Sequence, residues 1–330
     1  MKTTSMWVMI MNKIENYSNV IDYVLTEGEK LGNTIEIVNA NLQLPTNKLL
    51  TDGSRLMSPY YLVGELLYSL RGKNDLESIA YYSKFWNNMS DDNKTIRSAY
   101  GYLIQNRYNV NQLEHCAHLL MKNPDSRQAI IHLHEPKFNA TKDEICTLTI
   151  QFLIRDLKLD MIVTMRSNDI VLGLSYDHAF FLMYQSILAS RLSIGKGRYF
   201  HNVGSLHKYD DKKVNLNINH SKEYPIEFSY GFIDEHKKML GVEETVRKHY
   251  FEVVNNFEGF SYIEHAIDSI MKFEDKLART FMLAIYLFAI KDVEKRHVLL
   301  RKVKGFIPFS YGLFALIIDY EIENNKFGGF

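Results

Sequence analysis

The spacing of apolar residues along the first two thirds of the chain predicts a mixture of helices and strands. Apolar residues that recur every three or four positions predict helices at 12–31, 58–71, 75–89, 110–122 and 176–192. Apolar residues that alternate with polar ones predict strands at 34–38, 129–134, 147–155 and 158–165. These elements do not follow a simple strand–helix–strand order, and their mixture is typical of an α/β or α+β fold.

The pattern changes after Tyr209, because every element predicted beyond it is a helix. These helices are expected at 234–255, 261–292 and 296–324. We therefore expect a boundary near residue 215, which separates a core at 1–215 from a mainly helical C-terminal extension at 216–330. Packing of the extension against the core, to complete the domain, is the simplest interpretation.

Composition narrows the class of protein. The chain has 330 residues, 46% of them hydrophobic, which is enough for one large core. Lys+Arg and Asp+Glu both number 39, and the absence of a basic excess argues against a nucleic-acid partner. The apolar segments Met6–Met11 and Phe281–Ile290 are too short for a signal sequence or a bilayer span, so we expect core segments and a cytoplasmic protein without a membrane partner.

Cysteines and histidines bear on redox and metal chemistry. Cys116 and Cys146 are the only cysteines, too few for a disulfide framework or for a metal site of their own. Reduced thiols fit a cytoplasmic enzyme. Four histidines lie close together in the sequence without a complete ligand set, so no metal is expected; they are His115, His118, His132 and His134.

Cys146 has the most informative surroundings. A lone cysteine before an apolar strand is usually a buried core residue. Here it opens the run Cys146-Thr-Leu-Thr-Ile-Gln151, and Met165-Arg-Ser-Asn-Asp169 and Gly204-Ser-Leu-His-Lys-Tyr209 follow it in order. The motifs before it are Gly64-Glu-Leu-Leu67, Trp86, Tyr100-Gly101 and Pro124-Asp-Ser-Arg127.

These ordered motifs resemble those of thymidylate synthases and of the related deoxycytidylate and cytidylate hydroxymethylases. The resemblance covers about residues 28–209 and rests on several independent motifs. It implies a thymidylate synthase-like catalytic core, with an α/β fold of a mixed β-sheet and flanking helices, and a homodimer formed through the back face of the sheet. The C-terminal third does not match the usual synthase pattern.

The resemblance implies covalent catalysis by Cys146. Carbon 5 of a pyrimidine is a poor nucleophile, and addition of a thiolate to carbon 6 makes it nucleophilic. The thiol must ionise, and Arg166 is the cation expected beside it. Glu65 is implied as the general acid–base that moves protons on the ring. Tyr100 matches the tyrosine near the nucleophile.

The nucleotide phosphate is expected among arginines, whose planar fork suits a phosphate dianion. By resemblance, Arg166 and Ser167 come from one subunit and Arg127 reaches across from the other. Gln128 stands where many synthases have a second arginine, and Lys30 takes the place of an arginine in an N-terminal loop. A solvated lysine at a helix end is the alternative for Lys30.

Other site residues are also implied by the resemblance. His207 and Tyr209 match the pair that hydrogen-bonds a sugar hydroxyl, and Gln151 is assigned to the nucleotide site. Asp169 matches the aspartate that binds the pterin of 5,10-methylenetetrahydrofolate. The other residues assigned to this cofactor are Trp86, which matches a tryptophan beside the one-carbon unit, and Gly173.

Asp177 is the most informative departure from thymidylate synthases, which carry asparagine at this place. The asparagine amide donates to O4 of uracil and accepts from N3–H, whereas an ionised carboxylate only accepts. Cytosine offers its amino group to a carboxylate, and its N3 needs a proton as the adduct forms. Opposite uracil O4, the carboxylate would leave an unmet buried group at a cost of about 1–3 kcal/mol. A synthase subgroup that tolerates aspartate is the alternative.

The implied function is transfer of a one-carbon unit to C5 of CMP or dCMP by a homodimer. The intermediate with an exocyclic methylene at C5 gives a hydroxymethyl product if water adds to it and a methyl product if hydride adds to it. The C-terminus at 325–330 does not resemble the synthase tail, and this favours the hydroxymethyl product. The long extension favours the ribonucleotide, antibiotic-pathway branch. The alternatives are a thymidylate synthase that methylates dUMP and a non-catalytic nucleotide- or RNA-binding homologue, which the intact set of Cys146, Glu65, Arg166 and Tyr100 disfavours.

Overall fold

A mixed β-sheet forms the base of the protein, whose computed structural model describes residues 12–52, 54–135, 141–212, 222–255, 261–305 and 308–325. The strand order is β1-β3-β7-β6-β5-β4, and β2 pairs with β3. The strands are β1 (Asn12–Lys13), β2 (Glu29–Leu31), β3 (Thr34–Leu44), β4 (Ile130–His132), β5 (Thr147–Arg155), β6 (Lys158–Asp169) and β7 (Gly195–Tyr209).

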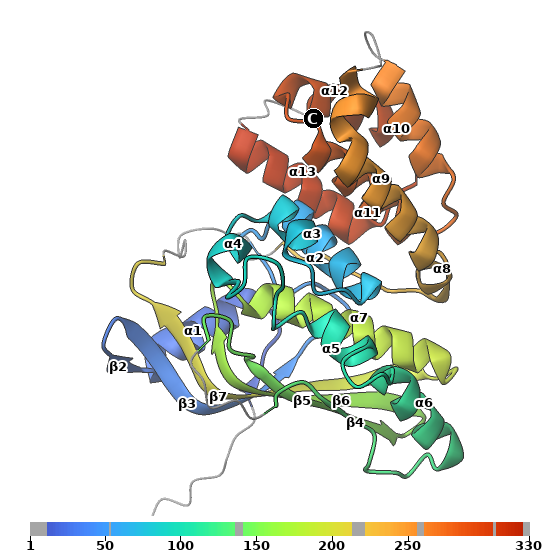
Figure 1. Ribbon diagram of the computed structural model, residues 1–330. Helices are drawn as coiled ribbons and strands as arrows, with labels where there is room; N and C mark the ends of the chain where they lie inside the picture. The colour runs from blue at the N-terminus through green and yellow to red at the C-terminus, as the bar shows by residue number, and fades with distance from the viewer. Residues whose placement is uncertain are drawn as a thin grey trace, which may run out of the picture.

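The helices gather on one side of this sheet (Figure 1). The long apolar helix α7 (Leu174–Arg191) and the shorter α1 (Tyr17–Glu27) pack directly on the strands. A second group of helices covers them, built around α2 (Pro59–Arg71). The others in the core are α3 (Leu76–Tyr82), α4 (Trp86–Met89), α5 (Tyr100–Gln105) and α6 (Gln112–Lys122). The predicted α/β fold, a mixed sheet with flanking helices, is confirmed.

The described segments after β7 form only helices, and they lie farthest from the sheet (Figure 1). They pack on α2 chiefly through α9, α11 and α13. The predicted boundary near residue 215 lies outside the described residues, so the division into core and extension stays a prediction. The helices are α8 (Tyr230–Asp234), α9 (His236–Asn255), α10 (Ser261–Met271), α11 (Lys276–Ala289), α12 (Val293–Lys304) and α13 (Tyr311–Asn325).

No helix of the described ranges covers the opposite face of the sheet (Figure 1). Side chains alternate along a strand, so Val163 is buried beneath the helices while its neighbours Ile162 and Thr164 are only partly buried on the other face. Phe200 and Asn202 of β7 are partly buried in the same way. This uncovered sheet face therefore mixes apolar and polar side chains.

The hairpin of β5 and β6 and the crossover to β7 set up the site. Asp156 and Leu157 both have positive φ, 50° and 57°, which is typical of a tight two-residue hairpin turn. The hairpin places the start of β5 beside the end of β6, where Thr147 pairs with Met165. Helix α7 then returns the chain so that β7 runs parallel to β6.

The predicted helix at 12–31 was wrong at both ends, because Asn12–Lys13 forms β1 and the helix begins at Tyr17. Helix α1 stops at Glu27, and Glu29–Leu31 forms a strand that pairs with the start of β3. Gly28 closes the helix in a tight contact, because a Cβ there would lie 2.4 Å from the Val24 carbonyl oxygen. Gly32 then supplies the positive φ, 56°, of the turn into β3.

Three predicted helices each proved to be two. The segments 75–89, 261–292 and 296–324 divide into α3 and α4, α10 and α11, and α12 and α13. In the second, Asp275 caps a new helix by accepting hydrogen bonds from the backbone amides of Leu277 and Ala278. Strand β7 was not predicted, because its sequence mixes glycines and polar residues with few alternating apolar ones.

The extension shares the hydrophobic core of the rest of the protein. The prediction that Phe281–Ile290 is core is confirmed, since Phe281, Leu283 and Leu287 are fully buried. In the described part of the chain, every helix is too short or too polar to cross a membrane. The segment Met6–Met11 lies outside the described residues.

Candidate active site

Five elements bring Arg166 and the predicted catalytic residues to one place. Cys146 immediately precedes β5, and Arg166 lies near the end of β6, where its backbone amide donates to the Cys146 carbonyl at 2.8 Å. Asp177 lies in the first turn of α7. Glu65 comes from α2, and Tyr100 opens α5. The charge of Asp177 raises the pKa of Glu65, Tyr100 and Cys146, as expected of groups in one cluster.

The Cys146 thiol lies beside the guanidinium of Arg166. Arg166 Nη2 is 3.5 Å from Cys146 Sγ, and the same side chain donates to the Ile145 and Glu144 carbonyls at 3.0 and 2.9 Å. Burial raises the pKa of the Cys146 thiol, and the positive charge of Arg166 opposes that rise. The expected cation is therefore present, but in the free protein burial outweighs it and the thiol holds its proton.

A chain of hydrogen bonds supports Glu65. Trp86 Nε1 donates to the Tyr61 hydroxyl at 3.1 Å, and that hydroxyl donates to Glu65 Oε1 at 2.8 Å. Burial raises the pKa of Glu65 to about 8, with a smaller contribution from the charge of Asp177. The other oxygen, Oε2, is buried and has no partner among the described residues. A protonated Glu65 therefore has a donor free for the substrate.

Asp177 is held by an amide. Asn168 Nδ2 donates to Asp177 Oδ2 at 2.7 Å. Burial raises the pKa of the Asp177 carboxyl to about 7, although the hydrogen bond from Asn168 acts in the opposite direction. Protonated and ionised forms are therefore both populated near neutral pH, which suits a group that accepts from an amine and delivers a proton.

Tyr100 closes the site above β5. The Thr147 backbone amide donates to the Tyr100 hydroxyl at 3.2 Å. Burial and the neighbouring Asp177 and Cys146 raise the pKa of Tyr100 well above its ordinary value, so the phenol stays protonated and its own hydrogen remains available as a donor.

Asp169 has one satisfied and one unsatisfied oxygen. Its Oδ1 accepts from the backbone amides of Val171 and Leu172 at 2.6 and 2.9 Å, whereas Oδ2 is buried without a partner in the described structure. A buried carboxylate oxygen normally has a donor, and the N–H groups of a pterin would supply one. Gly173 lies against the site, because a Cβ there would be 3.1 Å from both Asn168 Nδ2 and Asp177 Oδ2.

The proposed sugar-binding residues lie at the end of β7. His207 pairs in register with Asp169 of β6, and its ring meets the Tyr209 ring edge-on at 5.2 Å. Ser167 pairs with Ser205 on the same two strands. Lys30 reaches this end of the sheet from β2 but forms an ion pair with Asp210, with its side chain 55% exposed.

Arg127 and Gln151 lie apart from the cluster around Cys146. Gln151 Nε2 donates to the Arg127 carbonyl at 2.9 Å and so fixes the backbone before β4. The Arg127 side chain is exposed, and in the described residues no hydrogen bond or ion pair joins it to Cys146 or Arg166. Within one chain, the structure therefore does not bring Arg127 to the nucleophile.

Two residues that contact the predicted site residues were missed from the sequence, Tyr61 and Asn168. Tyr61, which orients Glu65, lies one helical turn before it on α2, so the spacing was a usable signal. Asn168 lies inside a quoted motif, but its contact with Asp177 is made only through the fold. No group of three or more metal-ligating side chains occurs in the described ranges.

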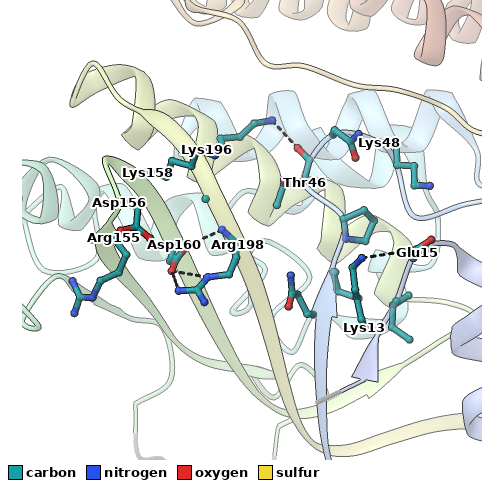
Figure 2. A pocket seen from close by; sticks show the side chains of 16 residues that line it. Lys13, Glu15, Thr46, Lys48, Arg155, Asp156, Lys158, Asp160, Lys196 and Arg198 are labelled. Atoms are coloured by element: carbon teal, nitrogen blue, oxygen red, sulfur yellow. Dashed lines mark hydrogen bonds and ion pairs between the residues drawn. The ribbon is translucent and has the colours of Figure 1, made fainter. Parts of the chain in front are cut away.

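A cavity of about 770 Å³ lies at the other end of the strands (Figure 2). Three of its cations are engaged: Lys13 pairs with Glu15, Arg198 pairs with Asp160, and Lys196 Nζ donates to the Thr46 carbonyl at 2.8 Å. Lys158 on its wall is eight residues from Arg166 along β6, a separation of about 26 Å in a strand. This cavity is therefore separate from the cluster around Cys146.

Comparisons with known proteins identify the family of this chain. A family model described as thymidylate synthase matches residues 15–254. Deoxycytidylate 5-hydroxymethyltransferase of Enterobacteria phage T4 is 37% identical over 139 residues, which cover 38% of this chain and 56% of that protein. Deoxyuridylate hydroxymethyltransferase of Bacillus phage SP01 is 28% identical over 232 residues, which cover 64% of this chain and 61% of that protein. This chain thus spans little more than half the length of the curated relatives it matches.

Among solved structures, the thermostable thymidylate synthase A of Bacillus subtilis aligns with a TM-score of 0.49 and 19% identity, over 60% of this chain and 84% of that one. The family model covers 240 of the 330 residues, from residue 15 to residue 254. The chain belongs to the thymidylate synthase family.

Proposed function

We propose that the protein adds a hydroxymethyl group to C5 of a cytidine nucleotide through a covalent Cys146–C6 adduct. The observation that carries this proposal is Asp177, a carboxyl group whose Oδ2 is already held as an acceptor by Asn168 and whose pKa is raised to about 7. Such a group accepts from the cytosine amino group and gives a proton to N3.

The residues around the ring have separate tasks in this proposal. Cys146 Sγ, as the thiolate, adds to C6, and N3 takes up the proton of Asp177, so C5 becomes nucleophilic. Arg166 at 3.5 Å favours the thiolate. Glu65, protonated at neutral pH and oriented by Tyr61, donates or accepts a proton at the ring and at the entering water.

The residues for the cofactor fit 5,10-methylenetetrahydrofolate. When bound, it supplies the one-carbon unit. Asp169 Oδ2, buried and unpaired, would accept from the pterin, and Gly173 leaves room beside Asp177. Trp86 would lie beside the cofactor while its Nε1 supports Tyr61.

A homodimer would complete the phosphate site. The uncovered sheet face carries half-buried apolar side chains such as Ile162 and Phe200, as expected of a surface that packs against a second copy. Arg127 is exposed beside the strand edge and is tied down through its carbonyl by Gln151, a residue of β5. In the proposed dimer, Arg127 of each subunit joins Arg166 and Ser167 of the other on the phosphate.

The deoxynucleotide is the favoured form of the substrate. The phage T4 and SP01 relatives are named for deoxycytidylate and deoxyuridylate. This supports dCMP over the ribonucleotide that the long extension suggested, and the antibiotic-pathway role stays a prediction. A second candidate, dUMP as substrate, is favoured by the SP01 relative, which is named for deoxyuridylate.

The test is to incubate the protein with methylenetetrahydrofolate and, separately, dCMP, CMP, dUMP and UMP, and to weigh the products. We expect a gain of one hydroxymethyl group on dCMP, none with Cys146→Ser, and a shift toward dUMP with Asp177→Asn, whose amide can donate to O4. A methyl group on dUMP from the unaltered protein would refute the proposal.

A further inference from the structure

A buried chain of hydrogen bonds runs from β7 to Asp177. The Tyr199 hydroxyl lies 2.9 Å from His201 Nδ1, and His201 Nε2 lies 3.1 Å from Asn168 Oδ1. Asn168 Nδ2 then donates to Asp177 Oδ2 at 2.7 Å. Tyr199 and His201 have no exposed surface, and Asn168 is 4% exposed. The chain therefore exchanges no hydrogen bonds with solvent before it reaches Asp177.

Tyr199, at the end of the hydrogen-bond chain remote from Asp177, fixes which atom donates in each of its hydrogen bonds. In the described structure the Tyr199 hydroxyl has one hydrogen-bond partner, His201 Nδ1, so it must donate there or leave a buried hydrogen unpaired. His201 is neutral because burial lowers its pKa to about 3, and its proton therefore lies on Nε2. That N–H donates to Asn168 Oδ1, which only accepts. The Asn168 amide cannot flip without breaking both of its hydrogen bonds.

Asp177 consequently has two unequal oxygens. Oδ2 faces an N–H of Asn168 and cannot carry a proton on that side. Gly173 lies against this contact, where a Cβ would be 3.1 Å from both Asn168 Nδ2 and Asp177 Oδ2. A proton taken up by Asp177 is therefore directed to Oδ1.

The order of donor and acceptor on a protonated carboxyl decides which pyrimidine it fits. Cytosine needs an acceptor at its amino group and a donor at N3. Uracil needs a donor at O4 and an acceptor at N3–H. A carboxyl whose two oxygens are equivalent can present either order, by moving its proton from one oxygen to the other, and would discriminate poorly.

We propose that Asn168 is a positioning residue that keeps the Asp177 proton on Oδ1 and so makes the site select cytosine over uracil. This inference rests on the function proposed above. His201 and Tyr199 act through Asn168, because they fix the direction in which its amide points. Selectivity for cytosine thus depends on a hydrogen-bond chain that begins on β7, outside the cluster around Cys146.

The test compares dCMP with dUMP, and CMP with UMP, by calorimetric binding in a Cys146→Ser background and by kcat/KM in the active protein. For Asn168→Ala we expect the preference for the cytosine nucleotide to fall about 10-fold, as one buried hydrogen-bonding group left unmet implies, with much of the change a gain for uracil. Tyr199→Phe preserves volume and should shift the ratio in the same direction by less.

Gln185→Ala is the matched control. Gln185 is also a buried amide with two backbone partners, the Leu159 and Arg198 carbonyls, and it lies on α7 away from Asp177. We expect Gln185→Ala to lower stability without changing the preference for cytosine over uracil nucleotides. If Asn168→Ala and Tyr199→Phe weaken both nucleotides equally, the inference is wrong; if Asn168→Ala does not fold, Tyr199→Phe decides. A preference of the unaltered protein for uracil would refute the proposed function, and this inference with it.

Discussion

At the scale of single residues, burial dominates the chemistry of the site. It raises the pKa of Glu65 to about 8 and of Asp177 to about 7, and it also raises the pKa of the Cys146 thiol. The free protein at neutral pH therefore holds protons on Glu65 and, in part, on Asp177, two carboxyl groups that would be ionised in water. In the proposed reaction these carboxyl groups give protons to the ring, and the thiol loses its own proton with the help of Arg166.

Glu65 predicts a specific dependence of stability on pH. The folded protein binds this proton more tightly than the unfolded chain, whose glutamate has a pKa near 4.5. The stabilisation is complete below pH 4.5 and is lost as pH rises toward 8, by up to about 1.4 kcal/mol per pH unit.

Glu65→Gln should remove this dependence. In denaturant unfolding at pH 5, 6, 7 and 8, the free energy of unfolding of the variant should rise relative to that of the unaltered protein with each increase in pH. A constant difference between the two proteins across this range would mean that Glu65 ionises normally.

Arg166 predicts the reactivity of the nucleophile. We expect Arg166→Gln to move the inflection of the iodoacetamide alkylation rate of Cys146 to higher pH, because the opposing positive charge is lost. Cys116 is fully buried, with its pKa raised to about 12, so it contributes no background. An unchanged inflection would show that the 3.5 Å contact does not tune the thiol.

Much of the site was predictable from residue types in sequence order, but their environments were not. The meeting of Cys146 with Arg166 was expected, and the 3.5 Å contact between them confirms it. That burial would outweigh Arg166, or that Asn168 would face Asp177, depends on packing between β6, β7 and α7 and has no signature along the chain.

At the scale of elements, the packing of α2 on α3 sets the depth of Glu65. A Cβ at Gly64 would lie 2.4 to 2.6 Å from the ring of Tyr82, so the two helices approach as closely as they do only because position 64 has no side chain. Because Glu65 is the next residue, the close packing of α2 on α3 at Gly64 also sets the position of Glu65 in the site.

Gly64→Ala should push α2 away from α3 and lower both stability and activity. We expect a loss of about 1–3 kcal/mol in the free energy of unfolding, typical of overpacking. The control is Gly241→Ala, another helical glycine, where a Cβ meets nothing within 4 Å and the change should be neutral or stabilising by up to about 1 kcal/mol. Equal effects of both substitutions would exclude a special role for Gly64.

Elements with clear periodicity were predicted well, and those shaped by tertiary contacts were not. The helix predicted at 58–71 and the strand predicted at 147–155 match α2 and β5. Strand β7 was missed because its partners β3 and β6, rather than its own sequence, make it a strand. The segment predicted at 261–292 is split at a side-chain cap, Asp275, which opens α11 within otherwise continuous helical periodicity.

At the scale of the whole molecule, the proposed dimer makes a complementation test possible. Arg127→Ala and Cys146→Ser should each be inactive alone, because each removes a different subunit's part of one site. Mixed and allowed to exchange, they should form heterodimers with one intact site, which returns about one quarter of the unaltered activity for random pairing of equal amounts. Mixed dimers without recovered activity would show that Arg127 serves its own chain.

Helix α2 faces the site on one side and the extension on the other. Tyr60 bonds Glu321 of α13, and Arg71 at the end of the helix forms a buried ion pair with Glu243 of α9. Grafting the extension of a relative onto this core would therefore also repack the helix that carries Glu65. Recombination between relatives would preserve these contacts only if α2, α9 and α13 were exchanged together.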